Sequence, residues 1–313
     1  MASPAQLVAA LKAIPDLRLW LRAPLAPFTT IGVGGPAAVL ASAGTARAAS
    51  QALAVLAAGE ASFTGLGAGS NLLVADRGYA GVALRLDAGL QYVEGPNAGS
   101  GGCVEVVAGA GLPLPRLATF VAEAGLSGLE FTCGIPGTVG GGVAMNAGAH
   151  GGWLGQAVDA VELAGPEGVS WVQASEFEWS YRRCRLPSAA MVTAVRLRLI
   201  RSTRKAVVER HRELLRARRL SQPRGVRTFG STFRNPPGDS AGRLLDQADM
   251  KGVCRRGAEV SSVHANFIVN QGDATAADVL VLMAMMRQAV QQRFGVSLEP
   301  EVRLLGAAFP WEC

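Results

Sequence analysis

The segment Cys133–Gly148, CGIPGTVGGGVAMNAG, says most about the fold. From Gly134 to Gly148 it holds six glycines in fifteen residues and no charged side chain. A structureless segment of this length and composition is uncommon inside a compact domain unless it has a function. Glycine also lets the backbone come close to a ligand. We therefore predict a loop whose backbone forms a wall against an anionic group.

A second glycine-rich segment, Gly65–Leu73 (GLGAGSNLL), allows successive N–H groups to point into one concavity. It lacks the lysine of a nucleoside-triphosphate loop. It also fails the GxGxxG pattern, because Leu72 or Ser70 stands where the last glycine belongs. Taken alone, a structural turn explains it equally well. Two such segments together indicate a dinucleotide pyrophosphate held by main-chain donors.

The length of 313 residues suits two or three domains, and 49% hydrophobic with 17% charged residues excludes a disordered chain. The longest strongly apolar stretch, Val279–Met286, has 8 residues, whereas a membrane-spanning helix needs about 20. No signal peptide is visible, so we predict a soluble cytoplasmic protein. The net charge of +6 favours anionic partners without choosing among them.

The five cysteines are Cys103, Cys133, Cys184, Cys254 and Cys313, and none belongs to a CxxC pair. An odd number without metal-ligand spacing is typical of reduced thiols in a reducing compartment. We expect no metal site.

Short β-rich runs alternate with glycine turns up to Ile200, which predicts an α+β fold. The predicted strands are Val82–Leu86, Cys103–Gly109, Ala157–Leu163, Ser170–Gln173, Val192–Ile200 and one around Ala265–Asn270. The predicted helices are Thr45–Ala58, Leu114–Ala124, the basic segment Arg201–Arg219 and Thr275–Phe294. The basic segment suits a solvated linker helix, with a phosphate-facing surface as the alternative.

Six blocks together resemble the UDP-N-acetylenolpyruvoylglucosamine reductase family, in that family's order. They are Pro24–Pro36 (PLAPFTTIGVGGP), Gly65–Val74 (GLGAGSNLLV), Gly125–Gly148 (GLSGLEFTCGIPGTVGGGVAMNAG), Phe229–Pro236 (FGSTFRNP), His264–Asn270 (HANFIVN) and Leu298–Gly306 (LEPEVRLLG). The chain resembles the family's short subclass, because no tyrosine stands between Arg182 and Ser231, where the longer subclass carries a tyrosine loop.

The resemblance implies an FAD-binding domain of the vanillyl-alcohol-oxidase (PCMH) type and a C-terminal α+β substrate domain. We place an N-terminal segment at 1–27, the FAD-binding domain at 28–200 with lobes near 28–77 and 78–200, and the substrate-binding domain at 201–297. A C-terminal segment, 298–313, would carry a catalytic glutamate back to the FAD-binding domain.

The implied reaction has two stages. NADPH reduces FAD, and the reduced flavin then reduces UDP-N-acetylglucosamine enolpyruvate to UDP-N-acetylmuramate for peptidoglycan synthesis. FAD would be bound non-covalently, because Gly65–Val74 contains no His or Cys. The expected partners are the UDP-sugar and NADPH, with no nucleic acid, membrane or obligate protein partner.

Three residues match the family's catalytic positions. Ser231 would donate a proton to C2 of the substrate, Arg182 would bind the substrate carboxylate, and Glu301 would help to stabilise its enol form. Their competing neighbours are Thr232, Arg183 and Glu299. Adjacent residues of an extended segment point oppositely, so only one of Arg182 and Arg183 can face the pocket; the motif selects Arg182.

The remaining site residues also follow from the resemblance. The predicted cofactor-binding residues are Gly67, Ala68, Gly69, Ser70, Asn71, Leu72, Gly134, Ile135, Pro136, Gly137, Thr138, Gly140, Gly141, Asn146, Ala147 and Gly148. The predicted substrate-binding residues are Arg182, Asn235 and His264. Ser221 replaces a lysine frequent in the family, so Arg218, Arg219 and Arg224 are the candidates for the substrate diphosphate.

Two alternatives stay open. The nearest enzyme alternative is another FAD-dependent oxidoreductase of the same fold, such as a sugar oxidase, but many of those attach FAD through a histidine near the pyrophosphate loop. A nucleic-acid-binding protein would use Arg201–Arg219, although that segment lacks interleaved aromatic residues.

Overall fold

The computed structural model describes residues 3–312, which form two compact units. The first unit comprises the chain up to Leu21, Val39–Ala68 and Gly81–Ala217. The second comprises Arg22–Ala38, Gly69–Ala80 and the chain from Arg218 onward. The predicted boundary between an FAD-binding domain ending at residue 200 and a substrate-binding domain beginning at residue 201 stays a prediction.

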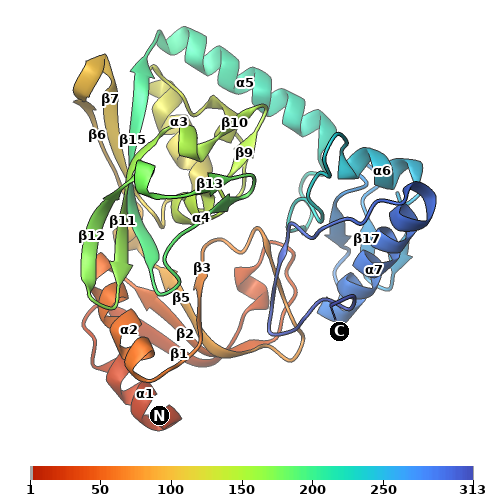
Figure 1. Ribbon diagram of the computed structural model, residues 1–313, viewed down its shortest axis with the longest axis horizontal. Coiled ribbons are helices and arrows are strands. Elements are labelled where there is room, and N and C mark those ends of the chain that lie inside the picture. The colour runs from red at the N-terminus through yellow and green to blue at the C-terminus, as the bar shows by residue number, and fades with distance from the viewer. Residues whose placement is uncertain (1–2, 313) are drawn as a thin grey trace. The chain divides into compact units, whose positions relative to one another are not determined.

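An antiparallel sheet forms the centre of the first unit (Figure 1). Its strand order is β12 (Gly168–Gln173), β11 (Val158–Gly165), β15 (Met191–Arg201), β7 (Val104–Gly109) and β6 (Val93–Ala98), and β8 (Leu126–Ser127) also pairs with β15. The buried positions of β7 alternate with half-buried ones, as expected for a sheet with one covered face. The predicted strands at 103–109, 157–163, 170–173 and 192–200 are confirmed.

A second sheet has the order β1 (Leu17–Pro24), β2 (Pro36–Ala43), β5 (Tyr79–Leu86) and β3 (Phe63–Leu66). The strand predicted at 82–86 is the end of β5. In the first unit, α2 (Ala46–Ala58) packs on β11 and β12. Its N-terminus is capped by the Thr45 hydroxyl, which accepts a hydrogen bond from the Ala48 N–H. The unit also contains α1 (Pro4–Lys12) and α3 (Leu114–Glu123).

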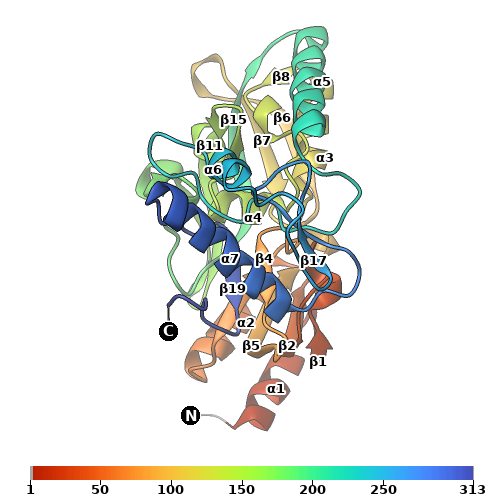
Figure 2. The same ribbon diagram turned by 90° about the vertical axis from the view of Figure 1, so that its right-hand side faces the viewer.

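The second unit has its own hydrophobic core, with Phe229, Phe233, Leu245 and Met286 fully or almost fully buried. Here α6 (Ala241–Gln247) contacts α7 (Ala276–Phe294), which also contacts the antiparallel sheet β16 (Cys254–Arg255), β17 (Ala258–Val260) and β18 (Ile268–Asn270), as Figure 2 shows. A parallel pair, β4 (Leu72–Val74) with β19 (Arg303–Leu305), joins two distant parts of the chain. The strand predicted around 265–270 and the helix at 275–294 are confirmed.

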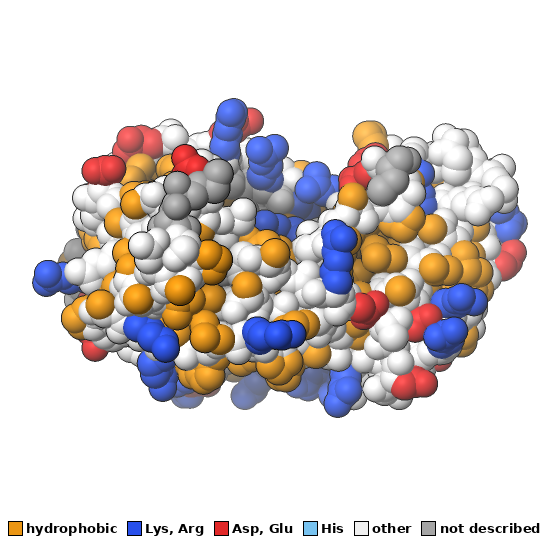
Figure 3. All heavy atoms as spheres, turned by 90° about the horizontal axis from the view of Figure 1, so that it is seen from below, with side chains coloured by type: hydrophobic (Ala, Val, Ile, Leu, Met, Phe, Trp, Pro, Cys, Tyr) orange, Lys and Arg blue, Asp and Glu red, His pale blue; other side chains and the backbone are white. Residues whose placement is uncertain are grey.

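The predicted basic helix is α5 (Arg204–Ser221), in which Val207 and Leu214 are the buried residues. Such a narrow apolar stripe is typical of a helix that is mostly solvated. Two of its arginines form ion pairs, Arg204 with Glu123 and Arg210 with Glu213. The narrow buried stripe and the two ion pairs favour the solvated-helix interpretation. Figure 3 draws another face of the molecule, on which Lys and Arg side chains are spread among apolar and neutral ones.

Among residues 3–312, no helix combines the length and the apolar character of a membrane span. Within the same range, Cys103, Cys133, Cys184 and Cys254 form no disulfide, and Cys313 lies outside the described residues.

Candidate active site

The first glycine-rich segment connects β3 to β4 and passes from one unit to the other between Ala68 and Gly69. In the second unit, Gly69 has φ +63°, and a Cβ at this position would overlap the Phe28 carbonyl oxygen. The Gly69 carbonyl in turn accepts a hydrogen bond of 3.2 Å from the Thr30 N–H. Both the conformation and the close approach therefore require glycine here.

In the first unit, the two glycine-rich segments meet. A Cβ on Gly67 would lie 2.8 Å from Oγ1 of Thr138, which is closer than a normal van der Waals contact. Gly67 is exposed and Thr138 is half-buried. Gly67 of the first segment thus packs against the Thr138 side chain of the second, about seventy residues away, at an accessible place.

The second segment is not a continuous loop, and that part of our expectation is wrong. It contains the short helix α4 (Val139–Ala144), whose N-cap hydroxyl on Thr138 accepts a hydrogen bond of 3.3 Å from the Gly141 N–H. The glycines allow α4 to pack closely on its neighbours. A Cβ on Gly140 would lie 2.8 Å from the Ala110 Cβ, and one on Gly142 would lie 2.8 Å from Leu154 Cδ1.

Arg182 lies in the turn of a hairpin formed by β13 (Trp179–Ser180) and β14 (Arg183–Cys184). Its φ is +59°, so the assumption that Arg182 and Arg183 lie on an extended segment is wrong. The turn places Arg182 by its own geometry and not by the alternation of a strand, whereas Arg183 is the first residue of β14. Arg182 Nη1 donates a 2.7 Å hydrogen bond to the Gly148 carbonyl, whereas Arg183 is exposed. The choice of Arg182 stays a prediction.

Asn146 connects the second glycine-rich segment to this hairpin. Its Nδ2 donates to the Ser180 carbonyl over 2.9 Å, and its Oδ1 accepts from the Gly155 N–H over 3.0 Å. The residue is 4% exposed and has φ +41°. Within the first unit, the end of the segment therefore supports the turn that carries Arg182.

Ser231 and Glu301 are brought together in the second unit. Phe233 forms a β-bridge with Pro300, the Glu301 N–H donates to the Thr232 carbonyl over 2.9 Å, and the Arg234 N–H donates to the Glu299 carbonyl over 2.8 Å. Asn71, a predicted cofactor-binding residue, donates from Nδ2 to the Glu301 carbonyl over 3.1 Å. The first glycine-rich segment thus contacts the segment of the predicted catalytic glutamate.

Burial separates the predicted catalytic residues from their neighbours. Ser231 is half-buried, whereas Thr232 is 0% exposed and its hydroxyl has no hydrogen-bond partner among the described residues. Glu301 is half-buried and Glu299 is exposed. A group that meets a substrate in a partly enclosed site is expected to have the intermediate accessibility of Ser231 and Glu301.

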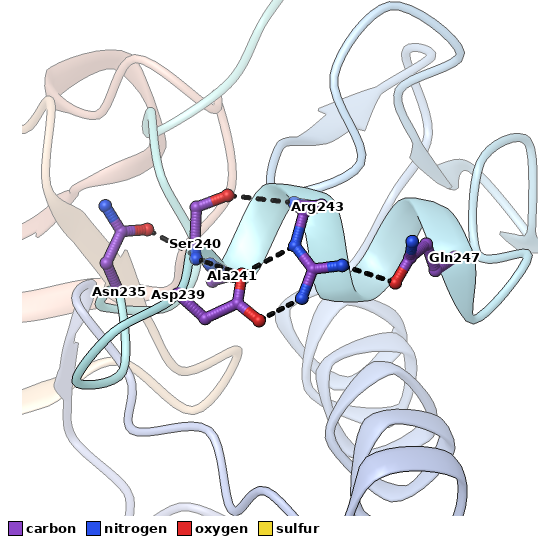
Figure 4. A network of polar contacts seen from close by, with 6 residues as sticks. All are labelled: Asn235, Asp239, Ser240, Ala241, Arg243 and Gln247. Carbon is purple, nitrogen blue, oxygen red and sulfur yellow. Dashed lines mark hydrogen bonds and ion pairs between the residues drawn. The ribbon is translucent and has the colours of Figure 1, made fainter.

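Asn235 belongs to a polar network at the N-terminus of α6 (Figure 4). Its Oδ1 accepts a 3.1 Å hydrogen bond from the Ala241 N–H. Beside it, Arg243 donates from Nε to Asp239 over 2.7 Å and from Nη1 to Gln247 over 2.7 Å. The Arg243 guanidinium lowers the pKa of the Asp239 carboxyl. The carbonyl end of the Asn235 side chain therefore binds the N-terminus of α6, and the substrate-binding role of Asn235 stays a prediction.

His264 packs edge-on against Phe267, with ring centroids 4.9 Å apart, and a Cβ on Gly242 would lie 2.7 Å from its Cε1. Its Nδ1 accepts a 3.2 Å hydrogen bond from the Asn266 N–H. Burial lowers the pKa of His264, and the nearby positive charge of Lys251 lowers it further. The structure therefore favours a neutral imidazole with Nε2 protonated.

The residues considered for the substrate diphosphate lie at the end of α5 and just after it. The Ser221 hydroxyl donates to the Arg218 carbonyl over 3.4 Å, and Arg219 and Arg224 are exposed.

Asn266 is a residue of this region that the sequence did not lead us to predict. It is 3% exposed, and both ends of its side chain bind the backbone of Phe233. The available signal was a polar residue enclosed by apolar ones in Ala265-Asn266-Phe267-Ile268.

The comparisons define first a class of protein. Residues 36–170 match the model of an FAD binding domain, and residues 222–305 match the model of the UDP-N-acetylenolpyruvoylglucosamine reductase C-terminal domain. The predicted fold class, α+β with an FAD-binding domain of the vanillyl-alcohol-oxidase type and a C-terminal α+β domain, is confirmed. The chain is thus an FAD-dependent oxidoreductase.

The family follows from its relatives. The chain is 47% identical over 288 residues to a UDP-N-acetylenolpyruvoylglucosamine reductase of Anaeromyxobacter sp. (strain Fw109-5), covering 91% of this chain and 87% of the relative. It is 41% identical over 297 residues to one of Acidiphilium cryptum, covering 94% of each. The crystal structure of the reductase from Thermus caldophilus matches with a TM-score of 0.79 at 38% identity, over 92% of this chain and 98% of that one. The chain belongs to the UDP-N-acetylenolpyruvoylglucosamine reductase family.

Proposed function

We propose that this protein reduces UDP-N-acetylglucosamine enolpyruvate to UDP-N-acetylmuramate with electrons from NADPH, in the cytoplasm, as a step of peptidoglycan precursor synthesis. The observation that carries the proposal is the pairing of the Ser231 and Glu301 segments. The Glu301 N–H donates to the Thr232 carbonyl over 2.9 Å, so two predicted catalytic residues seventy positions apart lie on paired backbones. The family supplies the substrate class and the geometry supports the residue roles.

The residues present fit FAD. The close approach of Gly67 to the Thr138 hydroxyl leaves no room for a side chain at position 67, which supports a site at Gly67 that is lined by main-chain donors. We assign the cofactor to the two glycine-rich segments, 67–72 and 134–148, in which Asn146 uses its side chain to support the Arg182 hairpin. When bound, the flavin accepts a hydride from one substrate and supplies it to the next.

The protein's own residues then bind the substrate carboxylate and supply a proton. The Arg182 guanidinium stays charged at any relevant pH and can hold the substrate carboxylate by two parallel hydrogen bonds. Ser231 donates the proton that the substrate C2 requires, and Glu301 stabilises the enol form of the carboxylate. Asn235 Nδ2 and His264 Nε2 are the donors proposed for the rest of the substrate. Arg218, Arg219 and Arg224 are proposed for its diphosphate.

Anaerobic stopped-flow absorbance tests the proposal. NADPH should bleach the flavin bands, and UDP-N-acetylglucosamine enolpyruvate should restore them with formation of UDP-N-acetylmuramate. NADH in place of NADPH is the control for the preferred donor. A preparation that NADPH does not bleach, but that a sugar bleaches and oxygen restores, would exclude the proposed reaction and favour a sugar oxidase.

A further inference from the structure

The side chain of Asn266 forms two hydrogen bonds with a single residue of the Ser231 segment. Its Oδ1 accepts from the Phe233 N–H over 2.9 Å, and its Nδ2 donates to the Phe233 carbonyl over 2.8 Å. The amide therefore takes the place of a strand neighbour, because it meets both polar backbone groups of that residue. Asn266 is 3% exposed and Phe233 is 0% exposed, so water has little access to either partner.

Further contacts from the same segment fix both sides of Ser231. The Asn266 carbonyl accepts from the Thr232 N–H over 2.8 Å, and Phe267 forms a β-bridge with Ser231. On its other edge, the Thr232 carbonyl accepts from the Glu301 N–H. His264 Nδ1 accepts from the Asn266 N–H and so holds the backbone at Asn266 in place. The backbone that carries Ser231 thus lies between the Asn266 segment and the Glu301 segment.

Removing the Asn266 amide would leave the Phe233 N–H and carbonyl buried without those partners, a costly state that the chain can relieve by shifting. Such a shift would act on Ser231, two residues away, and on the pairing with Glu301. Misplacement by about 1 Å can slow a reaction by about a hundredfold.

We propose that Asn266 is a positioning residue that sets the place of Ser231 for proton donation through its two bonds to Phe233. The proposal rests on the function proposed above. It concerns only the second stage, because reduction of the flavin by NADPH requires no proton at the substrate C2.

Asn270 provides a matched control. It is also buried, at 5% exposure, and its side chain makes three hydrogen bonds of the same kind. Its Nδ2 donates to the Ile31 carbonyl over 2.9 Å, and its Oδ1 accepts from the N–H groups of Gly272 and Ala274. These contacts hold segments other than those of Ser231 and Glu301. Asn270→Ala therefore removes a comparable set of buried side-chain hydrogen bonds elsewhere in the same unit.

The experiment compares Asn266→Ala, Asn266→Asp and Asn270→Ala with wild type in the two half-reactions, at saturating substrate. We expect Asn266→Ala to slow flavin reoxidation by the enolpyruvyl substrate about ten- to a hundredfold and to leave bleaching by NADPH within about twofold. In Asn266→Asp the carboxyl keeps the acceptor for the Phe233 N–H, and its protonated form, which burial favours, can still donate to the Phe233 carbonyl, so this variant should be less affected. It covers the case in which the alanine variant does not fold. Asn270→Ala should lower the stability of the protein without slowing reoxidation more than bleaching.

Two further measurements separate positioning from a general loss of structure. Amide hydrogen exchange of the peptide around Phe233 should become faster in Asn266→Ala and stay unchanged in Asn270→Ala. In a Ser231→Ala background, Asn266→Ala should cause no further slowing of reoxidation, because it acts through that serine.

Equal slowing of both half-reactions, or additive losses in the double variant, would overturn the proposal. If the enolpyruvyl substrate does not reoxidise the wild-type flavin, the proposed function itself fails. Faster amide exchange around Phe233 in Asn266→Ala would still show that the two Asn266 hydrogen bonds hold this backbone.

Discussion

At the scale of single residues, Ser231 and Thr232 are adjacent hydroxyls in different environments. Ser231 is half-buried, and Thr232 is fully buried with no partner for its hydroxyl in the part of the chain that the structure describes. Sequence alone separated them only through the motif position, because both side chains have the same chemistry. Accessibility supplies an independent reason to choose the serine.

Ser231→Ala should leave bleaching of the flavin by NADPH nearly unchanged and slow its reoxidation by the enolpyruvyl substrate. General-acid catalysis contributes about a hundred- to ten-thousandfold, and the loss should fall toward the upper end. Stopped-flow absorbance measures both stages. Equal slowing of the two stages would indicate a structural serine, and normal rates in both would move the donor elsewhere, with Glu301 the next candidate.

Thr232→Val should stabilise the protein. Valine has nearly the same shape, and it removes a buried hydroxyl whose desolvation is not offset by a hydrogen bond among the described residues. We expect the free energy of unfolding to rise by about 1 kcal/mol, with both half-reactions unchanged. Urea unfolding measures the change. A clear loss of stability would show that the hydroxyl is satisfied, for example by a buried water.

At the scale of elements, the well-predicted ones carry local signals. The helix at 275–294 has a capping box, in which Thr275 and Asp278 bond reciprocally, and Gly295 ends it at φ +69°. The strand at 104–109 shows the expected alternation of burial. The elements that we did not predict from the sequence include α1, α4, α6, β1 and β2. In α4, glycines lower the helix propensity, so the sequence there argues against a helix. The same glycines permit the close packing that the folded helix needs.

The N-terminus of α7 also depends on a residue two hundred positions earlier. Asp76 accepts hydrogen bonds from the N–H groups of Ala276 and Ala277, over 2.8 and 2.9 Å. A carboxylate there satisfies two N–H groups that have no partner within the helix, and it complements the helix dipole.

Asp76→Ala should therefore lower the free energy of unfolding by about 0.5 to 2 kcal/mol, and Asp76→Asn should lower it less because an amide oxygen can still accept. Chemical denaturation compares the two. Glu167→Ala, which removes an exposed carboxylate in the first unit, controls for the change in net charge. Equal effects of Asp76→Ala and Asp76→Asn would mean that the charge alone matters.

The loop of His264 should make stability depend on pH. Burial first, and Lys251 second, hold the pKa of His264 below its usual value of 6.5 despite the opposing charge of Asp246. Between the folded and unfolded pKa values, the unfolded chain binds more protons than the folded one. The free energy of unfolding should then fall as the pH drops below about 6.5.

Urea titrations at several pH values between about 7.5 and about 5, which bracket the usual histidine pKa, test this. His264→Gln should reduce the slope of stability against pH. His211, on α5, has a pKa lowered mainly by burial as well, so His211→Gln is the matched comparison. An unchanged slope in His264→Gln would show that folding does not lower the pKa of this histidine.

At the scale of the whole molecule, the site could be predicted only in part. The glycine-rich segments indicated an anion-binding backbone, and the family resemblance selected Arg182, Ser231 and Glu301. The contact of Gly67 with Thr138 and the pairing of Thr232 with Glu301 join residues about seventy positions apart. Such pairings depend on the assembled core, which no local pattern encodes. Asn266 was missed for the same reason, because its partners lie 33 residues away.

The purified protein should be yellow and should release its FAD when it is denatured. The segment Gly65–Val74 contains no histidine or cysteine that could attach the flavin. Acid precipitation followed by absorbance of the supernatant measures the release, and a known covalent flavoprotein is the control. Flavin that stays in the pellet would show a covalent link, and a colourless protein that takes up no added FAD would contradict the cofactor assignment.

The order in which the chain is made has a consequence for how it can mature. The chain passes between the two units five times, after residues 21, 38, 68, 80 and 217. Strand β4 (Leu72–Val74) pairs with β19 (Arg303–Leu305), which follows it by more than two hundred residues in the chain. Since domains tend to fold as units during synthesis, residues 22–38 and 69–80 must wait on the ribosome for a core that does not yet exist.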